Sequence, residues 1–139
     1  MVVARYMADT SANARIRHQP VEDRLAPLID RYLVATCAVL NLEALFSARS
    51  PVEYEQIWNW RNSIFEYVDT DESCMQRAQE VQRILAERSS HRVKLPDLII
   101  AATAEAHSLT LLHYDKEFDL IASVTKQSVE WIAPQGSLA

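Results

Sequence analysis

Four acidic residues, spread over the whole 139-residue chain, are of a type that suits one kind of chemistry. They are Asp9, Glu43, Asp97 and Asp115. Carboxylates that converge on one cleft repel each other unless a cation lies among them. Carboxylate oxygens are the ligands that Mg²⁺ and Mn²⁺ prefer, and these metals assist hydrolysis of phosphodiester bonds. If the fold brings the four acids together, they therefore predict a metal-dependent phosphodiesterase centre.

Asp119 is a fifth candidate acid, because it lies one helical turn beyond Asp115 and would share a face with it. A Zn²⁺ site is not expected, because the histidines and cysteines lack the spacing of zinc ligands. The histidines are His18, His91, His107 and His113.

Apolar runs and helical periodicity alternate along the chain and define the elements that must position the acids. Strands are expected over residues 2–8, 33–40, 66–68, 109–113 and 128–132. Helices are expected over residues 20–32, from 41, from 51, over 72–88, from 96 and over 115–122. This alternation predicts an α/β fold, an α/β/α sandwich with a mostly parallel central sheet.

The predicted sheet would bring the acids to one edge. Asp9 and Asp115 each follow a strand directly, and Glu43 lies one turn into the helix after the second strand. Asp97 opens its helix just after Pro96 and would reach the same edge from the side. Because ligands of such sheets bind beyond the carboxyl ends of the strands, this edge is the expected site.

Composition excludes several enzyme classes. The single glycine, Gly136, leaves no glycine-rich phosphate loop, dinucleotide fingerprint or nucleophile elbow in the body of the chain. The formal net charge is −5, but outside the five acids named above the acidic residues equal the Lys and Arg residues in number. The acidity is therefore concentrated at the expected site, and a nucleic-acid partner is still compatible with the charge.

Cys37 and Cys74 are the only cysteines, so no disulfide framework is expected. There is no secretory signal and no apolar run long enough for a membrane span, so the cytoplasm is the expected compartment, with no membrane partner. We expect one domain over residues 1–133, followed by a short tail over residues 134–139.

The roles of some polar and aromatic residues have two interpretations. Thr10 and Ser11 would cap the first helix, or a hydroxyl could hold a metal-bound water. Trp58 and Trp60 could stack on bases, but Trp60 has the spacing of a core stripe with Ile57, and a core position is favoured.

The basic residues before Asp97 also have two readings. They form either a phosphate-contact patch or a solvated loop, and they are Arg88, Arg92 and Lys94.

The chain resembles VapC toxins of the PIN-domain family from end to end. The resemblance is carried by YMADTSA at 6–12, NLE at 41–43, PDLIIAATA at 96–104 and LTLLHYDKEFD at 109–119. It implies a PIN-like sandwich, a Mg²⁺- or Mn²⁺-dependent endoribonuclease, a homodimer and inhibition by a VapB-type antitoxin.

The resemblance implies that Asp9, Glu43, Asp97 and Asp115 match the four acids of the family. It also implies that Asp119 matches an accessory acid. We expect Asp9 and Asp97 to be the closest metal ligands. Glu43 and Asp115 would hold a second metal or orient the attacking water.

Three other functions fit parts of the pattern. A PIN-fold nuclease of RNA processing would need no antitoxin, and a non-catalytic RNA- or protein-binding module would not need intact acids. A phospho-acceptor receiver domain needs an adjacent acidic pair after the first strand, whereas Asp9 is followed by Thr10.

Overall fold

The computed structural model describes residues 3–138, in which five short strands form one sheet in the order β3-β2-β1-β4-β5. All the pairings in this sheet are parallel. The strands are β1 Tyr6–Ala8, β2 Val34–Thr36, β3 Glu66–Tyr67, β4 Thr110–His113 and β5 Val129–Trp131. The predicted α/β architecture is confirmed, and the sheet is parallel throughout rather than mostly so. Val2, the first residue of the first predicted strand, lies outside the described residues.

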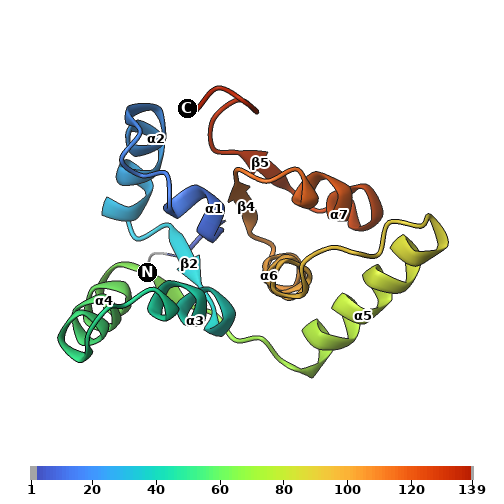
Figure 1. The fold of residues 1–139 in the computed structure, drawn as a ribbon, viewed down its shortest axis with the longest axis horizontal. Coiled ribbons are helices and arrows are strands. Elements are labelled where there is room, and N and C mark those ends of the chain that lie inside the picture. Colours follow the sequence, from blue (N-terminus) through green and yellow to red (C-terminus); the bar gives the residue numbers. More distant parts are fainter. Residues whose placement is uncertain (1–2, 139) are drawn as a thin grey trace.

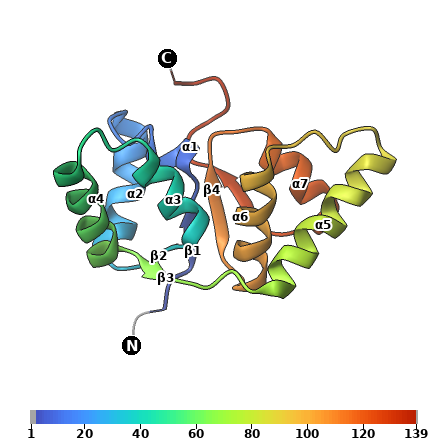
Figure 2. The same cartoon turned by 60° about the horizontal axis from the view of Figure 1, so that its bottom comes forward.

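Helices connect the strands and cover both faces of the sheet (Figures 1 and 2). They are α1 Thr10–Asn13, α2 Gln19–Asp30, α3 Ala38–Phe46, α4 Pro51–Ile64, α5 Glu72–Glu87, α6 Leu95–Ala106 and α7 Glu117–Thr125. In both views α4 lies at one end of the molecule, and α5 and α7 lie at the other.

Alternate residues of the central strands belong to different hydrophobic clusters, as the two-residue repeat of a strand requires. Met7 and Leu111 pack in the cluster under α5, α6 and α7. Ala8 and Leu112 pack in the cluster under α2. Both faces of the sheet are therefore buried, which explains why its strands read as continuous apolar runs.

Two predictions about the elements were wrong. The apolar run 33–40 is not one strand, because the chain leaves β2 after Thr36 and α3 already begins at Ala38. Trp60 is not a core residue: it is 56% exposed, and the residue that α4 buries is Arg61.

Within residues 3–138 the helices are too short or too polar to cross a membrane. Cys37 and Cys74 are both buried and free. The C-terminal segment turns back onto the body, where the backbone N–H of Leu138 donates to the Tyr114 hydroxyl at 3.0 Å.

Candidate active site

Asp9 is held at the end of β1 by its own position as the N-cap of α1. Its Oδ2 accepts a hydrogen bond from the backbone N–H of Ser11 at 2.9 Å. Its own N–H donates to the Leu112 carbonyl of β4 at 2.9 Å. The residue is 4% exposed, and its Oδ1 is buried without a hydrogen-bond partner. The fold therefore fixes this carboxylate and leaves one oxygen available.

Asp97 lies in the first turn of α6 and is 6% exposed. Burial, together with the nearby charge of Asp9, raises the pKa of the Asp97 carboxyl to about 7, against the opposing effect of Lys94. Its Oδ2 is buried without a hydrogen bond, since the Lys94 ammonium lies 3.7 Å away. Asp9 and Asp97 thus form a pair whose charges destabilise each other without a cation between them.

Asp115 lies beside Asp97, in the loop between β4 and α7, in a group of acids that does not include Asp9 or Glu43. A carboxylate oxygen from each of Asp97, Asp115 and Glu117 can be chosen so that all three lie within 4.8 Å of one another. Burial raises the pKa of Asp115, but the hydrogen bonds from Lys94 and from the Glu117 N–H outweigh it, so the pKa is lowered overall. Asp115 is therefore a carboxylate over the whole neutral range.

Lys94 is the cation of this cluster. Its ammonium donates to Asp115 Oδ2 at 2.7 Å and lies 3.7 Å from both Asp97 and Glu117. The hydrogen bond to Asp115 is the main cause that raises the pKa of Lys94. The side chain is 61% exposed, so it can move away into solvent without disturbing the core.

Glu43 lies on α3, which contacts the short helix α1. Its Oε1 accepts a hydrogen bond from the Thr10 hydroxyl at 2.9 Å. The Ser11 hydroxyl instead accepts from the N–H of Tyr114 at 2.9 Å, which ties α1 to the end of β4. Thr10 and Ser11 thus position neighbouring groups, while the cap of α1 is Asp9 itself.

Asp119 does not join the acidic cluster. Its Oδ2 accepts a hydrogen bond from the Trp131 indole at 2.8 Å, and its Oδ1 lies 3.6 Å from His113 Nε2. The His113 ring is fully buried between Phe118 and Trp131, and burial lowers its pKa. Asp119 therefore caps an aromatic cluster beside the site.

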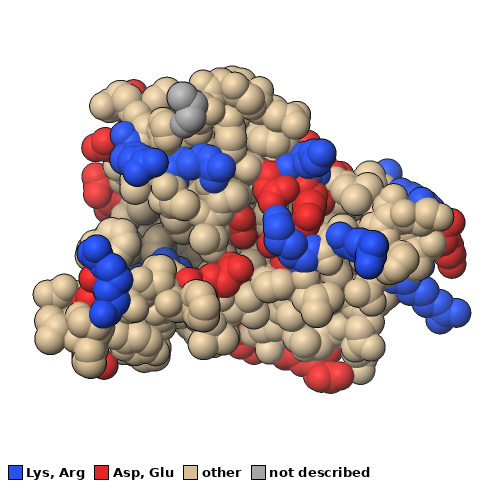
Figure 3. Space-filling view, viewed as in Figure 1, with Lys and Arg blue, Asp and Glu red and all other residues tan. Residues whose placement is uncertain are grey.

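The acids are also visible as a group on the surface. In Figure 3 a patch of Asp and Glu lies near the centre of the face, over the junction of α1, α6 and α7, with Lys and Arg beside it. An anionic substrate would meet cationic side chains at the border of this acidic patch, an arrangement that suits a metal-assisted reaction on a phosphate.

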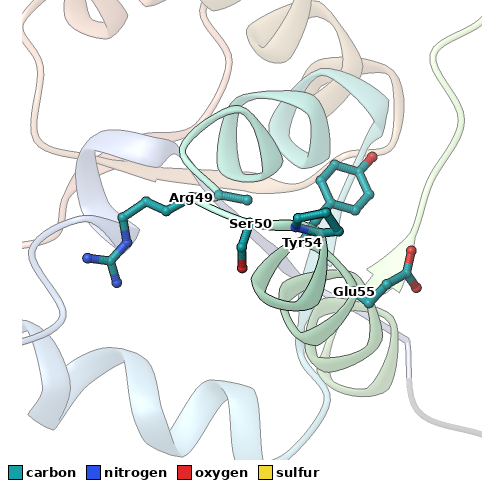
Figure 4. Close-up of a pocket in the computed structure, with 6 residues that line it drawn as sticks. Arg49, Ser50, Tyr54 and Glu55 are labelled. Carbon is teal, nitrogen blue, oxygen red and sulfur yellow. The ribbon is translucent and has the colours of Figure 1, made fainter.

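A hollow at the turn between α3 and α4 has no comparable arrangement. It is lined by Arg49, Ser50, Tyr54 and Glu55, and in Figure 4 Arg49 and Glu55 point to opposite sides. Arg49 is instead paired with Glu53 of α4 at 3.2 Å. No set of polar groups converges there, so this hollow is not a candidate site.

Comparison with known proteins places this arrangement in a family. Residues 6–124 match the PIN domain family. Ribonuclease VapC21 of Mycobacterium tuberculosis (strain H37Rv) is 42% identical over 137 residues, which cover 98% of this chain and 99% of the relative. Ribonuclease VapC51 of the same strain is 40% identical and covers 96% of this chain and 97% of its own. This chain belongs to the VapC ribonucleases of the PIN-domain family.

Solved VapC-type structures share the fold. The DNA-bound VapBC structure from Salmonella typhimurium aligns with a TM-score of 0.72 at 18% identity, over 94% of this chain and 99% of that chain. VapBC-5 from Mycobacterium tuberculosis aligns with a TM-score of 0.59 at 25% identity, over 92% of this chain and 97% of that chain. The recognition of a VapC toxin from sequence is confirmed.

The acids of this VapC chain fit a divalent cation. Asp9 Oδ1 and Asp97 Oδ2 are buried oxygens without hydrogen bonds, and a buried unpaired carboxylate oxygen is costly. An all-oxygen set of carboxylates is the donor set of Mg²⁺ or Mn²⁺ rather than of Zn²⁺. A bound cation would satisfy both oxygens and relieve the repulsion that raises the pKa of Asp97.

Sequence reasoning missed Glu117 as a member of this VapC site. Its N–H donates to Asp115 Oδ1 at 3.0 Å, and this short turn folds its carboxylate back toward Lys94. The available signal was its position two residues after Asp115, an acid that itself follows a strand. Lys94 was expected either in a phosphate patch or in a solvated loop, and it is in fact paired with the acids.

Proposed function

We propose that this chain is the toxin of a type II toxin–antitoxin pair, an endoribonuclease whose Mg²⁺ or Mn²⁺ is held by Asp9, Asp97 and Asp115. The observation that supports this most directly is the pair of buried, unsatisfied oxygens on Asp9 and Asp97. When bound, the cation would neutralise these acids and polarise the scissile phosphate and the attacking water.

The other polar residues of the site have roles that follow from their contacts. Glu43, oriented by the Thr10 hydroxyl at 2.9 Å, is placed to accept a proton from the attacking water or to hold a second cation. Glu117 adds a carboxylate to the Asp97–Asp115 group. The Lys94 ammonium neutralises this group in the metal-free protein and is placed to contact an RNA phosphate once displaced.

The test of this function is cleavage of RNA by the purified chain. Cleavage should stop in EDTA and return with Mg²⁺ or Mn²⁺. Asp9→Asn and Asp97→Asn should each remove at least about 99% of the activity while the proteins stay folded. Glu87→Gln is the matched control, because it removes an exposed charge on α5 far from the site. Cleavage that continues in EDTA, or in folded Asp97→Asn, would reject the metal mechanism.

An antitoxin is the proposed partner. The aligned structures from Salmonella typhimurium and Mycobacterium tuberculosis are VapBC structures. In this chain Trp60 of α4 is exposed and lines two hollows that face α2, together with Ile16 and Ile29. An amphipathic helix of a VapB-type antitoxin would bury this apolar surface, and a basic side chain near it would pair with the acidic cluster. Addition of the antitoxin should therefore stop RNA cleavage.

We also propose that the chain forms a homodimer through α3 and α6. These helices are in contact and present three large exposed side chains: Phe46 at 90%, Leu42 at 65% and Leu95 at 63% exposure. Apolar side chains exposed together mark a protein interface more often than a free surface. Light scattering should give twice the chain mass for the wild type and the single mass for Phe46→Glu. A wild type that is monomeric at high concentration would reject the dimer.

A further inference from the structure

A buried guanidinium between α2 and α4 has no acidic partner. Arg61 is 7% exposed. Its Nε donates to Asn41 Oδ1 and its Nη2 to Thr36 Oγ1, both at 3.0 Å, and both acceptors are neutral. Throughout residues 3–138, no carboxylate oxygen lies within 4.0 Å of this guanidinium in an ion pair, so a full positive charge is buried among neutral groups.

This burial is unusual within the same chain and is energetically unfavourable. Arg77 and Arg24 are both more exposed than Arg61, and each is paired with a glutamate. A buried charge without a counter-charge is costly, which is the reason that buried charges are nearly always paired. An anion that reached Arg61 would therefore gain a strong, desolvated ion pair without having to displace an internal partner.

An anion can reach Arg61 from the surface through a pocket. Arg61 lines a partly enclosed pocket of about 150 Å³. The other lining residues are Asn13, Ile16, Ile29, Trp60 and Phe65. The guanidinium carbon lies 4.9 Å from the centre of the Phe65 ring, and the Trp60 ring packs edge-on against the same ring at 6.3 Å. The surface is hollowed between α2 and α4 in Figure 3. Apart from Asn13, the walls of the pocket are apolar, and Arg61 is the only cation among its lining residues.

We propose that this pocket binds a carboxylate side chain, Asp or Glu, from the apolar helix of the antitoxin, and that Arg61 is the anchor of this contact. The proposal rests on the proposed function, since it specifies the chemistry of the antitoxin. A short carboxylate flanked by apolar residues would pair with Arg61 while its neighbours bury Ile16 and Trp60.

An RNA phosphate fits the pocket less well than a carboxylate side chain. The walls are apolar and carry one cation, whereas binding of a phosphate backbone normally uses several basic groups along an open groove. The acidic cluster, where RNA must react, is built by α1, α6 and α7, whereas the Arg61 pocket lies between α2 and α4.

The proposed contact also gives specificity between toxin–antitoxin pairs. An antitoxin with a neutral or apolar side chain at this point would cover Arg61 and leave the charge buried without an anion. The resulting penalty would reject such a partner more strongly than a poor apolar fit would.

The test measures the affinity of the full-length VapB-type antitoxin proposed as partner for four forms of the toxin. Arg61→Gln should weaken binding by about thirtyfold or more, as expected when one partner of a buried charge pair is truncated. Arg61→Lys should recover part of the affinity, because it keeps the charge. Arg83→Gln, which removes an exposed arginine on α5, should bind like the wild type.

The partner carboxylate is found by changing each acidic residue of the antitoxin to its amide. One of these variants should lose as much affinity as Arg61→Gln, and combining the two changes should cause little further loss. Binding of Arg61→Gln within twofold of the wild type would overturn the proposal, and so would a loss that no antitoxin carboxylate shares.

Two further measurements keep the outcomes distinct. RNA cleavage by free Arg61→Gln should equal that of the wild type. An increase in the KM for RNA, together with unchanged antitoxin binding, would show that the pocket holds RNA instead. Wild-type cleavage failing in the same assay would count against the nuclease, not against this contact. If Arg61→Gln does not fold, the Arg61 Nε–H signal in nuclear magnetic resonance of the wild type should shift when the antitoxin binds and stay unshifted with the antitoxin's amide variant.

Discussion

At the scale of single residues, Asp97 links the acidic cluster to stability. Its pKa is raised from the ordinary 3.8 to about 7, chiefly by burial and then by Asp9. The folded protein therefore holds a proton that the unfolded chain releases near pH 4. The stability that comes from this proton is fully present below about pH 4 and is lost as the pH rises through 7.

The first prediction follows from this sign. In metal-free buffer the wild type should lose stability relative to Asp97→Asn between pH 4 and pH 8, by an upper amount of about 4 kcal/mol. Thermal unfolding of the two proteins across this range measures the difference. Asp97→Asn should be the more stable protein near pH 8 without metal. Parallel curves for the two proteins would show that Asp97 is ionised at all these pH values.

Lys94 gives a second prediction at this scale. Its ammonium supplies the positive charge among Asp97, Asp115 and Glu117 when no metal is present. Lys94→Met should lower the melting temperature in EDTA and should increase the gain in melting temperature that Mg²⁺ produces. The melting temperature falls because the metal-free cluster loses the cation that neutralises it. The gain with Mg²⁺ rises because the Lys94 ammonium no longer competes with the metal for the carboxylates. Equal gains in the two proteins would mean that Lys94 and the metal do not compete.

Asp119 gives a third prediction, because its carboxylate accepts from the Trp131 indole and faces His113 instead of the cluster. Asp119→Asn keeps an acceptor for the indole, so its RNA cleavage rate should stay within about threefold of the wild type. Its affinity for Mn²⁺ should be unchanged. A loss of both would place Asp119 among the metal ligands.

Sequence reasoning reached some of these residues and not others, for physical reasons. Asp9 and Asp115 were predictable at the same edge because each directly follows a strand of a parallel sheet. Glu117 was not, because only the turn in which its N–H binds Asp115 Oδ1 brings its carboxylate back to the group. Asp119 was expected to share a helix face with Asp115, but α7 begins only at Glu117, and the Trp131 indole holds the Asp119 side chain elsewhere.

At the scale of secondary-structure elements, the run 33–40 shows where pattern reasoning stops. Every residue of β2 is buried, and Leu40 of α3 is buried as well. A continuous apolar run is equally typical of a strand covered on both faces and of the first turn of a buried helix. The switch occurs at Cys37, which has extended backbone and no side-chain cap, so no residue type marks the start of α3.

The prediction that the apolar stripe of α4 is buried was wrong for a different reason. Its spacing of Ile57, Trp60 and Ile64 is a true helical stripe, but Trp60 is exposed and Arg61 is the buried residue. Sequence periodicity identifies an apolar face without saying whether the face packs inside the same chain or against another one. The antitoxin proposed for the groove beside α4 would account for the exposed Trp60, which the chain itself leaves uncovered.

At the scale of the whole molecule, substrate, second copy and antitoxin are each assigned to a surface with a different chemistry. The acids gather at the carboxyl edge of the sheet, at the junction of α1, α6 and α7 (Figure 3). The uncovered apolar residues form two further groups: on α3 and α6 for the proposed second copy, and between α2 and α4 for the proposed antitoxin. The proposed dimer surface borders the site, because Leu42 and Phe46 line one hollow with Glu43. The antitoxin helix is assigned to the groove between α2 and α4, from which a basic side chain of the antitoxin would reach the acidic cluster.

The central claim is that Asp9, Asp97 and Asp115 form a site for a divalent cation. The most direct test is calorimetric titration of Mn²⁺ into the metal-free wild type, Asp97→Asn and the control Glu87→Gln near pH 7. The account predicts that the wild type and the control bind Mn²⁺ and release protons, because Asp97 is partly protonated there and must ionise to bind. It predicts that folded Asp97→Asn binds at least about tenfold more weakly and without this proton release. Equal affinity and equal proton release in all three proteins would contradict the account.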